Sequence, residues 1–161
     1  MISPTLSAAL MEHMKNEYFS FYLYRSMGCY FNKVGLTGFE CFFTSQSDDE
    51  KCHADKFLAF LKESRVDNIQ MLPIEGPRYE FENAMAAMIY TLDHEKYVTE
   101  SIQNLRDMAK DENNHEVEVF LEWFITEQIE ERDLISTLID RMRIAESGAG
   151  LLLIDQELGA K

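Results

Sequence analysis

Four stretches of this chain repeat apolar residues at alternating steps of three and four, and a carboxylate interrupts each repeat near its middle. Apolar residues at this spacing line one face of an α-helix. The interrupting acids are Glu17, Glu50, Glu95 and the pair Glu127 and Glu131. Residues that favour turns are concentrated between the stretches, which predicts four long helices. The predicted helices span about 5–33, 38–65, 80–110 and 114–145.

The acids of neighbouring helices reach the same level when the helices are folded as antiparallel hairpins. Glu17 and His53 lie equally far on either side of the first break, and Glu50 is one helical turn from His53. In the second hairpin, Glu95 faces the segment 128–131. Each hairpin therefore carries carboxylates at mid-height.

The connection between the second and third helices decides how the two hairpins combine. Residues 66–78 can span about 43 Å when extended, and a 28-residue helix is about 42 Å long. The connection can therefore run the full length of the bundle, so that the second and third helices are parallel. This arrangement is an all-α, ferritin-like four-helix bundle with one long crossover. We expect a single domain over 1–161, with a short fifth helix at about 149–158.

In this fold all the mid-helix acids meet inside the bundle, which points to a metal centre. Buried carboxylates repel one another and cannot all stay ionised without a counter-charge. No lysine or arginine lies on the central part of the apolar faces. Glu50 and His53 share a helix face at i and i+3, and oxygen ligands with one nitrogen favour a redox-active ion such as iron. A second Glu-x-x-His, Glu112 to His115, falls in a break and is interpreted as a solvated turn.

Composition excludes several classes of partner. The chain has 29 acidic and 15 basic residues and a net charge of -14, which disfavours nucleic acid and anionic membranes. No apolar window is long enough for a membrane span, and no signal pattern occurs at the start. The three cysteines, Cys29, Cys41 and Cys52, are an odd number and are interpreted as reduced thiols. We therefore expect a cytoplasmic protein.

Motifs along nearly the whole chain, from Leu6 to Leu158, resemble those of the non-haem bacterial-type ferritins. The matching segments are 16–24, 49–53, 95–105, 120–131 and 150–158. The resemblance implies a cage of 24 subunits with a ferroxidase centre inside each bundle. It also implies storage of iron, in which Fe(II) is oxidised by dioxygen or hydrogen peroxide and kept as a ferric mineral.

The resemblance also implies roles for individual residues. One iron would be held by Glu17, Glu50 and His53. The second would be held by Glu50, Glu95 and Glu131, with Gln128 close by. A third, peripheral iron would be held by Asp49, Glu127, Glu130 and Glu131. Tyr24 would hydrogen-bond a ligand carboxylate or give up an electron, although a core tyrosine is an equal alternative. Lys51 stands where bacterioferritins have their haem methionine, so no haem is expected.

Two other functions remain open on the sequence alone. A soluble di-iron oxidase or oxygenase would act on an organic substrate, store nothing, and need a substrate pocket in place of the fifth helix. A bundle without metal would keep its acids protonated or exposed to solvent.

Several residues near the acids are assigned simpler roles. We expect Trp123 to serve packing, Cys52 to be a small buried residue, and His94 to face solvent or a neighbouring subunit. The acids Glu112, Glu116 and Glu118 suit the positive end of the fourth helix, while the resemblance offers an iron channel as a second interpretation of Glu118.

Overall fold

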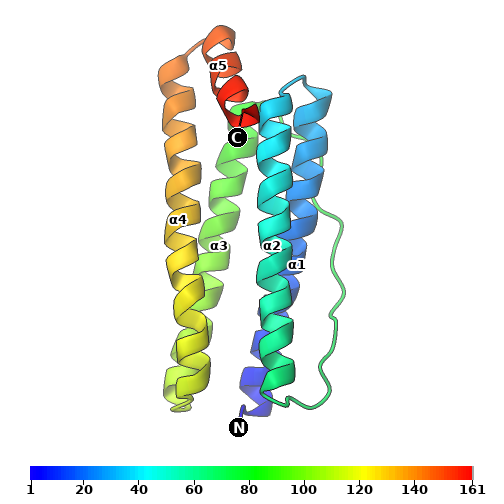
Figure 1. Cartoon of the computed structure of the whole chain (residues 1–161), viewed down its shortest axis with the longest axis vertical. Helices are drawn as coiled ribbons and strands as arrows, with labels where there is room; N and C mark the ends of the chain where they lie inside the picture. The colour runs from blue at the N-terminus through cyan, green and yellow to red at the C-terminus, as the bar shows by residue number, and fades with distance from the viewer. Residues whose placement is uncertain (161) are drawn as a thin grey trace.

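The structure, a computed structural model that describes residues 1–160, consists of five α-helices. They are α1 (Pro4–Lys33), α2 (Thr37–Glu63), α3 (Ala84–Asp111), α4 (His115–Ala145) and α5 (Gly148–Gly159). The helices α1 and α2 form one antiparallel hairpin, α3 and α4 form a second, and the hairpins lie side by side (Figure 1). Within residues 1–160 there is no strand, so the all-α prediction is confirmed. None of these helices has both the length and the apolarity needed to cross a membrane.

The connection from α2 to α3, residues 64–83, runs along the whole bundle (Figure 1). It carries the chain from the end of α2 back to the opposite end of the molecule, so α2 and α3 point in the same direction. The predicted long crossover is therefore confirmed. The helix α3 begins later than the predicted start at about 80, because Asn83 caps it. The Asn83 side chain accepts a hydrogen bond from the backbone N–H of Ala86 at 2.9 Å.

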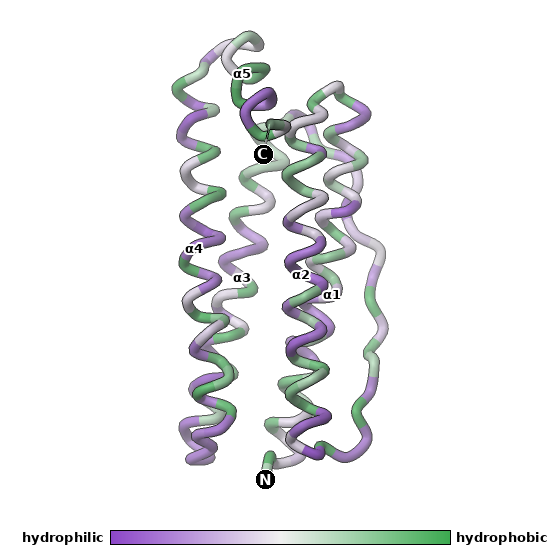
Figure 2. The backbone as a smooth tube through the Cα atoms, in the orientation of Figure 1, coloured by the Kyte–Doolittle hydropathy of each residue, from purple (hydrophilic) through white to green (hydrophobic). Residues whose placement is uncertain are grey.

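Two apolar clusters fill the bundle above and below a polar layer. In the cluster toward α5, the ring of Phe31 stacks on Phe39 and Phe43 at centroid distances of 4.9 and 5.2 Å. In the cluster toward the N-terminus, Phe57 and Phe124 lie 4.6 Å apart. Hydrophilic stretches at mid-height of α2 and α4 mark the layer between them (Figure 2). The two clusters fix the spacing of the helices at the level where the polar side chains meet.

The helix α5 packs closely against the start of α2. A Cβ atom on Gly38 would lie 1.7 Å from the backbone oxygen of Asp155, so only glycine fits there. The Asp155 carboxylate accepts a hydrogen bond from the backbone N–H of Phe39 at 2.9 Å, which suits the positive end of α2. Ile154 and Leu158 join the apolar cluster at this end.

Candidate metal centre

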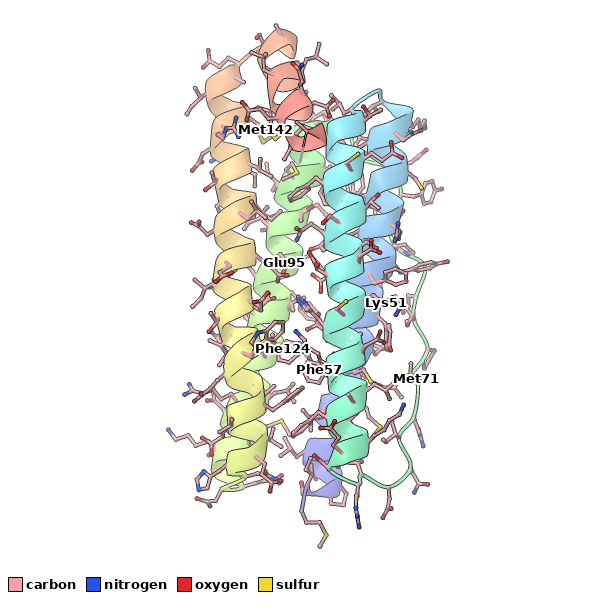
Figure 3. The ribbon with its side chains drawn as sticks, in the orientation of Figure 1. Lys51, Phe57, Met71, Glu95, Phe124 and Met142 are labelled. Carbon is pink, nitrogen blue, oxygen red and sulfur yellow. The ribbon has the colours of Figure 1, made fainter. Side chains whose placement is uncertain are left out.

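Each of the four long helices places one buried glutamate in the polar layer. The exposed fractions of Glu17, Glu50, Glu95 and Glu131 are 1%, 2%, 1% and 8%. Glu95 lies at mid-height of the bundle, above Phe124 of the cluster nearer the N-terminus (Figure 3). The predicted coincidence of the acids at one level is therefore present in the folded chain.

The side chains of the layer form two groups that share one glutamate. Glu17, Glu50 and His53 each offer a ligand atom within 4.8 Å of the others, and so do Glu50, Glu95 and Glu131. His53 Nδ1 is 3.2 Å from Glu50 Oε2 and 4.0 Å from Glu17 Oε2. Two cations that share the Glu50 carboxylate can be accommodated by this arrangement.

Two buried carboxylate oxygens in the layer have no hydrogen-bond partner among the described residues: Glu17 Oε2 and Glu131 Oε2. Buried polar atoms are nearly always paired, since leaving one unpaired costs about 1–3 kcal/mol. The two oxygens belong to different groups of ligand atoms. A cation in each group would satisfy them, so the residues present fit a dinuclear metal site.

The pKa is raised in three of the four carboxyl groups, so their ionisation is opposed. Burial, followed by repulsion from the neighbouring acids, raises the pKa of Glu50 well above its ordinary value. The same causes raise the pKa of Glu131 to about 10. Burial also raises the pKa of Glu95 to about 7, although hydrogen bonds from Tyr24 and Gln128 oppose the shift. Without cations the layer therefore retains protons at neutral pH, and a bound divalent cation can replace them.

Tyr24 and Gln128 hold the Glu95 carboxylate from two sides. The Tyr24 hydroxyl donates to Glu95 Oε1, and Gln128 Nε2 donates to Glu95 Oε2 at 3.0 Å. Burial and then the Glu95 charge raise the pKa of Tyr24 well above its ordinary value, so the phenol keeps its proton. Gln128 Nε2 also donates to the Thr99 hydroxyl at 3.2 Å. Tyr24 and Gln128 thus orient a carboxylate of the centre.

Sequence reasoning missed His13, which is 1% exposed and touches the centre directly. Its Nε2 atom is 2.7 Å from Glu17 Oε1, and its Nδ1 atom is 2.8 Å from Ser101 Oγ. Burial opposes the ionised form of Glu17, but His13, together with smaller effects of Glu50 and His53, outweighs it, and the pKa of Glu17 is lowered. The signal was available, because residues four apart share a helix face.

The sequence of the chain that forms this centre matches a known protein family. A model of the Ferritin-like domain matches residues 7–145. The chain belongs to the ferritin family. A bacterial non-heme ferritin of Staphylococcus aureus (strain USA300) is 30% identical over 162 aligned positions, which cover 100% of this chain and 97% of that protein. A bacterial non-heme ferritin of Staphylococcus epidermidis (strain ATCC 35984) is 32% identical with the same coverage.

Solved ferritin structures match the fold over its whole length. An open pore ferritin from the hyperthermophilic archaeon Archaeoglobus fulgidus superposes with a TM-score of 0.97 and 33% identity, covering 100% of this chain and 99% of that one. An engineered closed form of the same ferritin gives a TM-score of 0.96, also at 33% identity, and covers 98% of its chain. The match extends through the long crossover and α5, so this chain has the complete ferritin fold.

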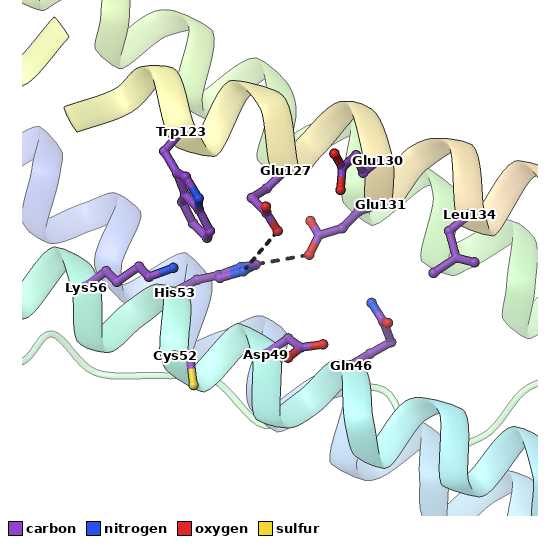
Figure 4. A pocket seen from close by; sticks show the side chains of 10 residues that line it. All are labelled: Gln46, Asp49, Cys52, His53, Lys56, Trp123, Glu127, Glu130, Glu131 and Leu134. Atoms are coloured by element: carbon purple, nitrogen blue, oxygen red, sulfur yellow. Dashed lines mark ion pairs between the residues drawn. The ribbon is translucent and has the colours of Figure 1, made fainter. Parts of the chain in front are cut away.

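Beside the buried centre of this ferritin, a pocket of about 310 Å³ opens between α2 and α4 (Figure 4). Asp49 and Glu130 line it and are exposed, while the Glu127 side chain is 30% exposed. His53 Nε2 is 4.0 Å from Glu127 Oε2, and ligand atoms of His53, Glu127 and Glu131 lie within 4.8 Å of one another. Of the residues expected for a third iron, Asp49, Glu127 and Glu130 therefore lie at the mouth of the centre, and Glu131 connects them to the buried layer.

The structure differs from the expectation for Cys52 and narrows that for His94. Cys52 is exposed on the wall of the pocket, because the side of α2 on which it lies faces the opening and not a neighbouring helix. His94 is half-buried and does not point freely into solvent: its Nε2 atom is 2.7 Å from Ser20 Oγ, and its ring lies 5.7 Å from that of Phe19. A contact of His94 with a neighbouring subunit stays a prediction. Burial lowers the pKa of His94 to about 4.

The buried face of α4 is also displaced from the predicted one. The repeat of three and four that includes Glu127 and Glu131 also contains Phe120 and Leu134, and it predicts that all four are buried. In the structure, Phe120 and Glu127 are partly exposed and Leu134 is 39% exposed. The buried positions are Val117, Leu121, Phe124, Gln128, Glu131, Ile135, Leu138, Ile139 and Met142. Gln128 and Glu131 therefore face the layer, and Glu127 lies at its edge.

Trp123 and Lys56 form one side of the pocket mouth. The Trp123 ring lies edge-on to His53 at 5.4 Å between centroids, and Lys56 Nζ lies 3.2 Å from the centre of the Trp123 ring. Trp123 is 40% exposed, so it packs on His53 from the solvent side.

Proposed function

We propose that this chain oxidises Fe(II) at the centre in its polar layer and stores Fe(III) as a mineral inside a protein cage. The observation that carries the proposal is the position of Glu50, whose carboxylate belongs to both groups of ligand atoms. Membership of the ferritin family supports iron storage and Fe(II) oxidation. Carboxylate oxygens with a single imidazole suit iron better than a structural zinc site.

In this proposal the two irons share Glu50 as a bridging ligand, and their other ligands differ. The first Fe(II) is bound by Glu17, Glu50 and His53. The second Fe(II) is bound by Glu50, Glu95 and Glu131. Tyr24 and Gln128 orient Glu95 by the hydrogen bonds described above.

The paired arrangement matches the electron count of the reaction. Each Fe(II) gives up one electron, and two neighbouring ions supply the two electrons that reduce dioxygen to hydrogen peroxide, or hydrogen peroxide to water. The glutamates neutralise the charge of the metal ions as it increases. The Tyr24 hydroxyl keeps its proton and donates it in a hydrogen bond to Glu95.

Oxidised iron leaves through the pocket between α2 and α4. A third iron site at its mouth is formed by Asp49, Glu127, Glu130 and Glu131. The short distance between His53 and Glu127 supports a connection from the buried centre to this site.

The cage is built from 24 copies of the chain in the cytoplasm. Leu152 and Leu153 on α5 are 58% and 63% exposed in the single chain, and such apolar side chains are typical of surfaces that bury themselves in an assembly. No haem is expected, since Lys51 stands at the position of the haem ligand of bacterioferritins.

Oxidation and storage can be tested together by adding Fe(II) to the assembled protein in air. We expect a particle of 24 chains by light scattering, and ferric iron that co-elutes with the protein in size-exclusion chromatography. The variant Glu50→Ala should lose the oxidation, while His115→Ala should keep it. A much smaller particle, or oxidation with no retained iron, would instead assign the chain to the di-iron oxidases.

A further inference from the structure

His13 connects Glu17 to a helix on the other hairpin. Its ring lies between Glu17 on its own helix α1 and Ser101 on α3, at 2.7 Å from Glu17 Oε1 and 2.8 Å from Ser101 Oγ. The ring also packs on Phe57 of α2 at a centroid distance of 4.9 Å. Three helices therefore fix the plane and position of this one imidazole.

The direction of the hydrogen bond to Glu17 follows from the chemistry of the two partners. An ionised carboxylate only accepts hydrogen bonds, so the hydrogen between His13 and Glu17 is on His13 Nε2. The Ser101 hydroxyl can donate to Nδ1 of a neutral ring or accept from a protonated one. In either case Nε2–H donates to Glu17 Oε1, and Ser101 fixes the ring orientation that makes this possible.

One oxygen of Glu17 is thereby occupied and the other is left for a ligand. Oε1 accepts from His13, whereas the buried Oε2 has no hydrogen-bond partner among the described residues. Oε2 is the atom that lies 4.0 Å from His53 Nδ1. The bond from His13 thus selects which oxygen of Glu17 faces His53.

We propose that His13, held by Ser101, is a positioning residue that aims Glu17 Oε2 at the cation bound by Glu17, Glu50 and His53. This inference rests on the proposed function, since it takes Glu17 as a ligand. Partners that orient metal ligands in this way typically change metal affinity by about 10- to 100-fold when removed. The effect should be confined to the first cation, because His13 makes no hydrogen bond to Glu95 or Glu131.

The substitutions must preserve the volume of His13. A surface pocket of about 260 Å³ between α1 and α3 reaches both His13 and Ser101, so a small residue at position 13 would admit water to the layer. His13→Leu removes the donor while filling the space. His13→Gln keeps an N–H at the end of the side chain and should restore the bond to Glu17.

Calorimetric titration of the assembled, metal-free protein with Zn²⁺ tests the proposal without any oxidation step. His13→Leu should weaken binding of the first ion by about 10- to 100-fold and leave the second ion unchanged, and His13→Gln should stay within about threefold of the wild type. Ser101→Ala should fall between them. The matched control is Ser20→Ala, which removes a hydroxyl 2.7 Å from His94 and should leave both affinities unchanged.

The outcomes separate the inference from the proposed function. If wild-type protein binds no Zn²⁺ in this centre, the proposed function fails and the inference fails with it. If wild-type protein binds two ions and both His13→Leu and Ser101→Ala match its first affinity, the positioning role is overturned while the centre stands. If His13→Leu does not fold, the affinity of Ser101→Ala for the first ion decides the test: weaker binding supports the positioning role, and unchanged binding overturns it. A lower melting temperature with unchanged affinities would show a purely structural role and would also overturn the proposal.

Discussion

The chain contains two Glu-x-x-His pairs whose surroundings are opposite. Glu50 and His53 are 2% and 4% exposed in the polar layer, within reach of acids from the other three long helices. Glu112 is exposed at the turn between α3 and α4, and the His115 side chain is 84% exposed. Identical spacing in the sequence thus produces a candidate metal centre in one place and a solvated turn in the other.

The difference lies in what the other helices bring to each pair. Glu112 accepts a hydrogen bond from Ser3 Oγ at 2.7 Å, and His115 Nδ1 is 3.0 Å from Glu118 Oε1, so each has one polar neighbour and free access to water. Water can solvate such charges without a cation. At Glu50 burial removes water, and the nearby acids raise its pKa. The spacing supplies two ligands, and the level in the bundle decides whether they need a cation.

The largest contrast is expected in Fe(II) oxidation. Glu50→Ala and His53→Ala should each lower the initial rate by about 100-fold or more, equivalent to about 2.7 kcal/mol in activation free energy. Glu112→Ala and His115→Ala should leave the rate within about twofold, because neither contacts the layer. The initial rates of all four variants are measured by ferric absorbance in stopped flow. An equal loss of oxidation rate in the variants of both pairs would contradict the conclusion that only Glu50 and His53 belong to a metal centre.

The next contrast concerns the stability of the metal-free protein. The pKa of Glu95 is raised from 4.5 to about 7 and that of Glu131 to about 10. Above pH 4.5 these two carboxyl groups therefore bind more protons in the folded state than in the unfolded state, and their contribution to stability falls as pH rises. His94, whose pKa is lowered to about 4, acts in the opposite direction up to about pH 6.5 and offsets part of this fall. Between pH 5 and pH 8 we expect Tm to fall by about 5 °C, and saturating Zn²⁺ to reverse the fall.

Two variants sharpen this test of stability. Glu131→Gln cannot ionise and should flatten the dependence of Tm on pH. His115→Ala should leave the slope as it is in the wild type. A metal-free wild type whose Tm rises steadily from pH 5 to pH 8 would show that the acids of the layer are not desolvated.

A smaller effect is expected when a hydrogen-bond donor to each region is removed. Tyr24→Phe deletes the O–H that donates to Glu95 and should slow oxidation by about fivefold, since a net hydrogen bond is worth about 1 kcal/mol. Ser3→Ala deletes the O–H that donates to Glu112 and should leave the rate unchanged, although it also removes the cap of α1. Stopped-flow rates at equal Fe(II) loading provide the comparison.

The smallest effect is expected at the mouth of the centre. Asp49→Asn should leave the first turnover unchanged and slow later turnovers by about twofold, because Asp49 is exposed and lines the pocket proposed as the exit of oxidised iron. Asp48→Asn changes a neighbouring exposed acid that pairs with Arg25 and serves as the control. Sequential additions of Fe(II) distinguish the first turnover from the later ones.

The sequence predicted the meeting of the acids because helices have a constant rise per residue. Equal distances from a turn put Glu17 opposite His53, and the same argument put Glu95 opposite Gln128. The same geometric argument also predicted that Glu50 is buried and that Glu112 lies in an exposed turn. The fold and most residues of the centre could therefore be predicted from the regular geometry of helices.

The failures occurred where the contacts of a side chain depend on a distant helix. His13 was missed because its significance comes from Ser101 on another helix. Cys52 was misjudged because the side of α2 on which it lies borders an open pocket. The displaced face of α4 arose because a repeat of three and four fits two adjacent rows of a helix almost equally well.

Anaerobic titration of the metal-free protein with Fe(II) tests the central claim, that Glu50 serves two iron sites at once. We predict saturation at about two tight ions per chain in the wild type, loss of both in Glu50→Gln, and loss of one in Glu17→Gln. Binding of two ions in Glu50→Gln with wild-type affinity, or no saturable binding in the wild type, would contradict it.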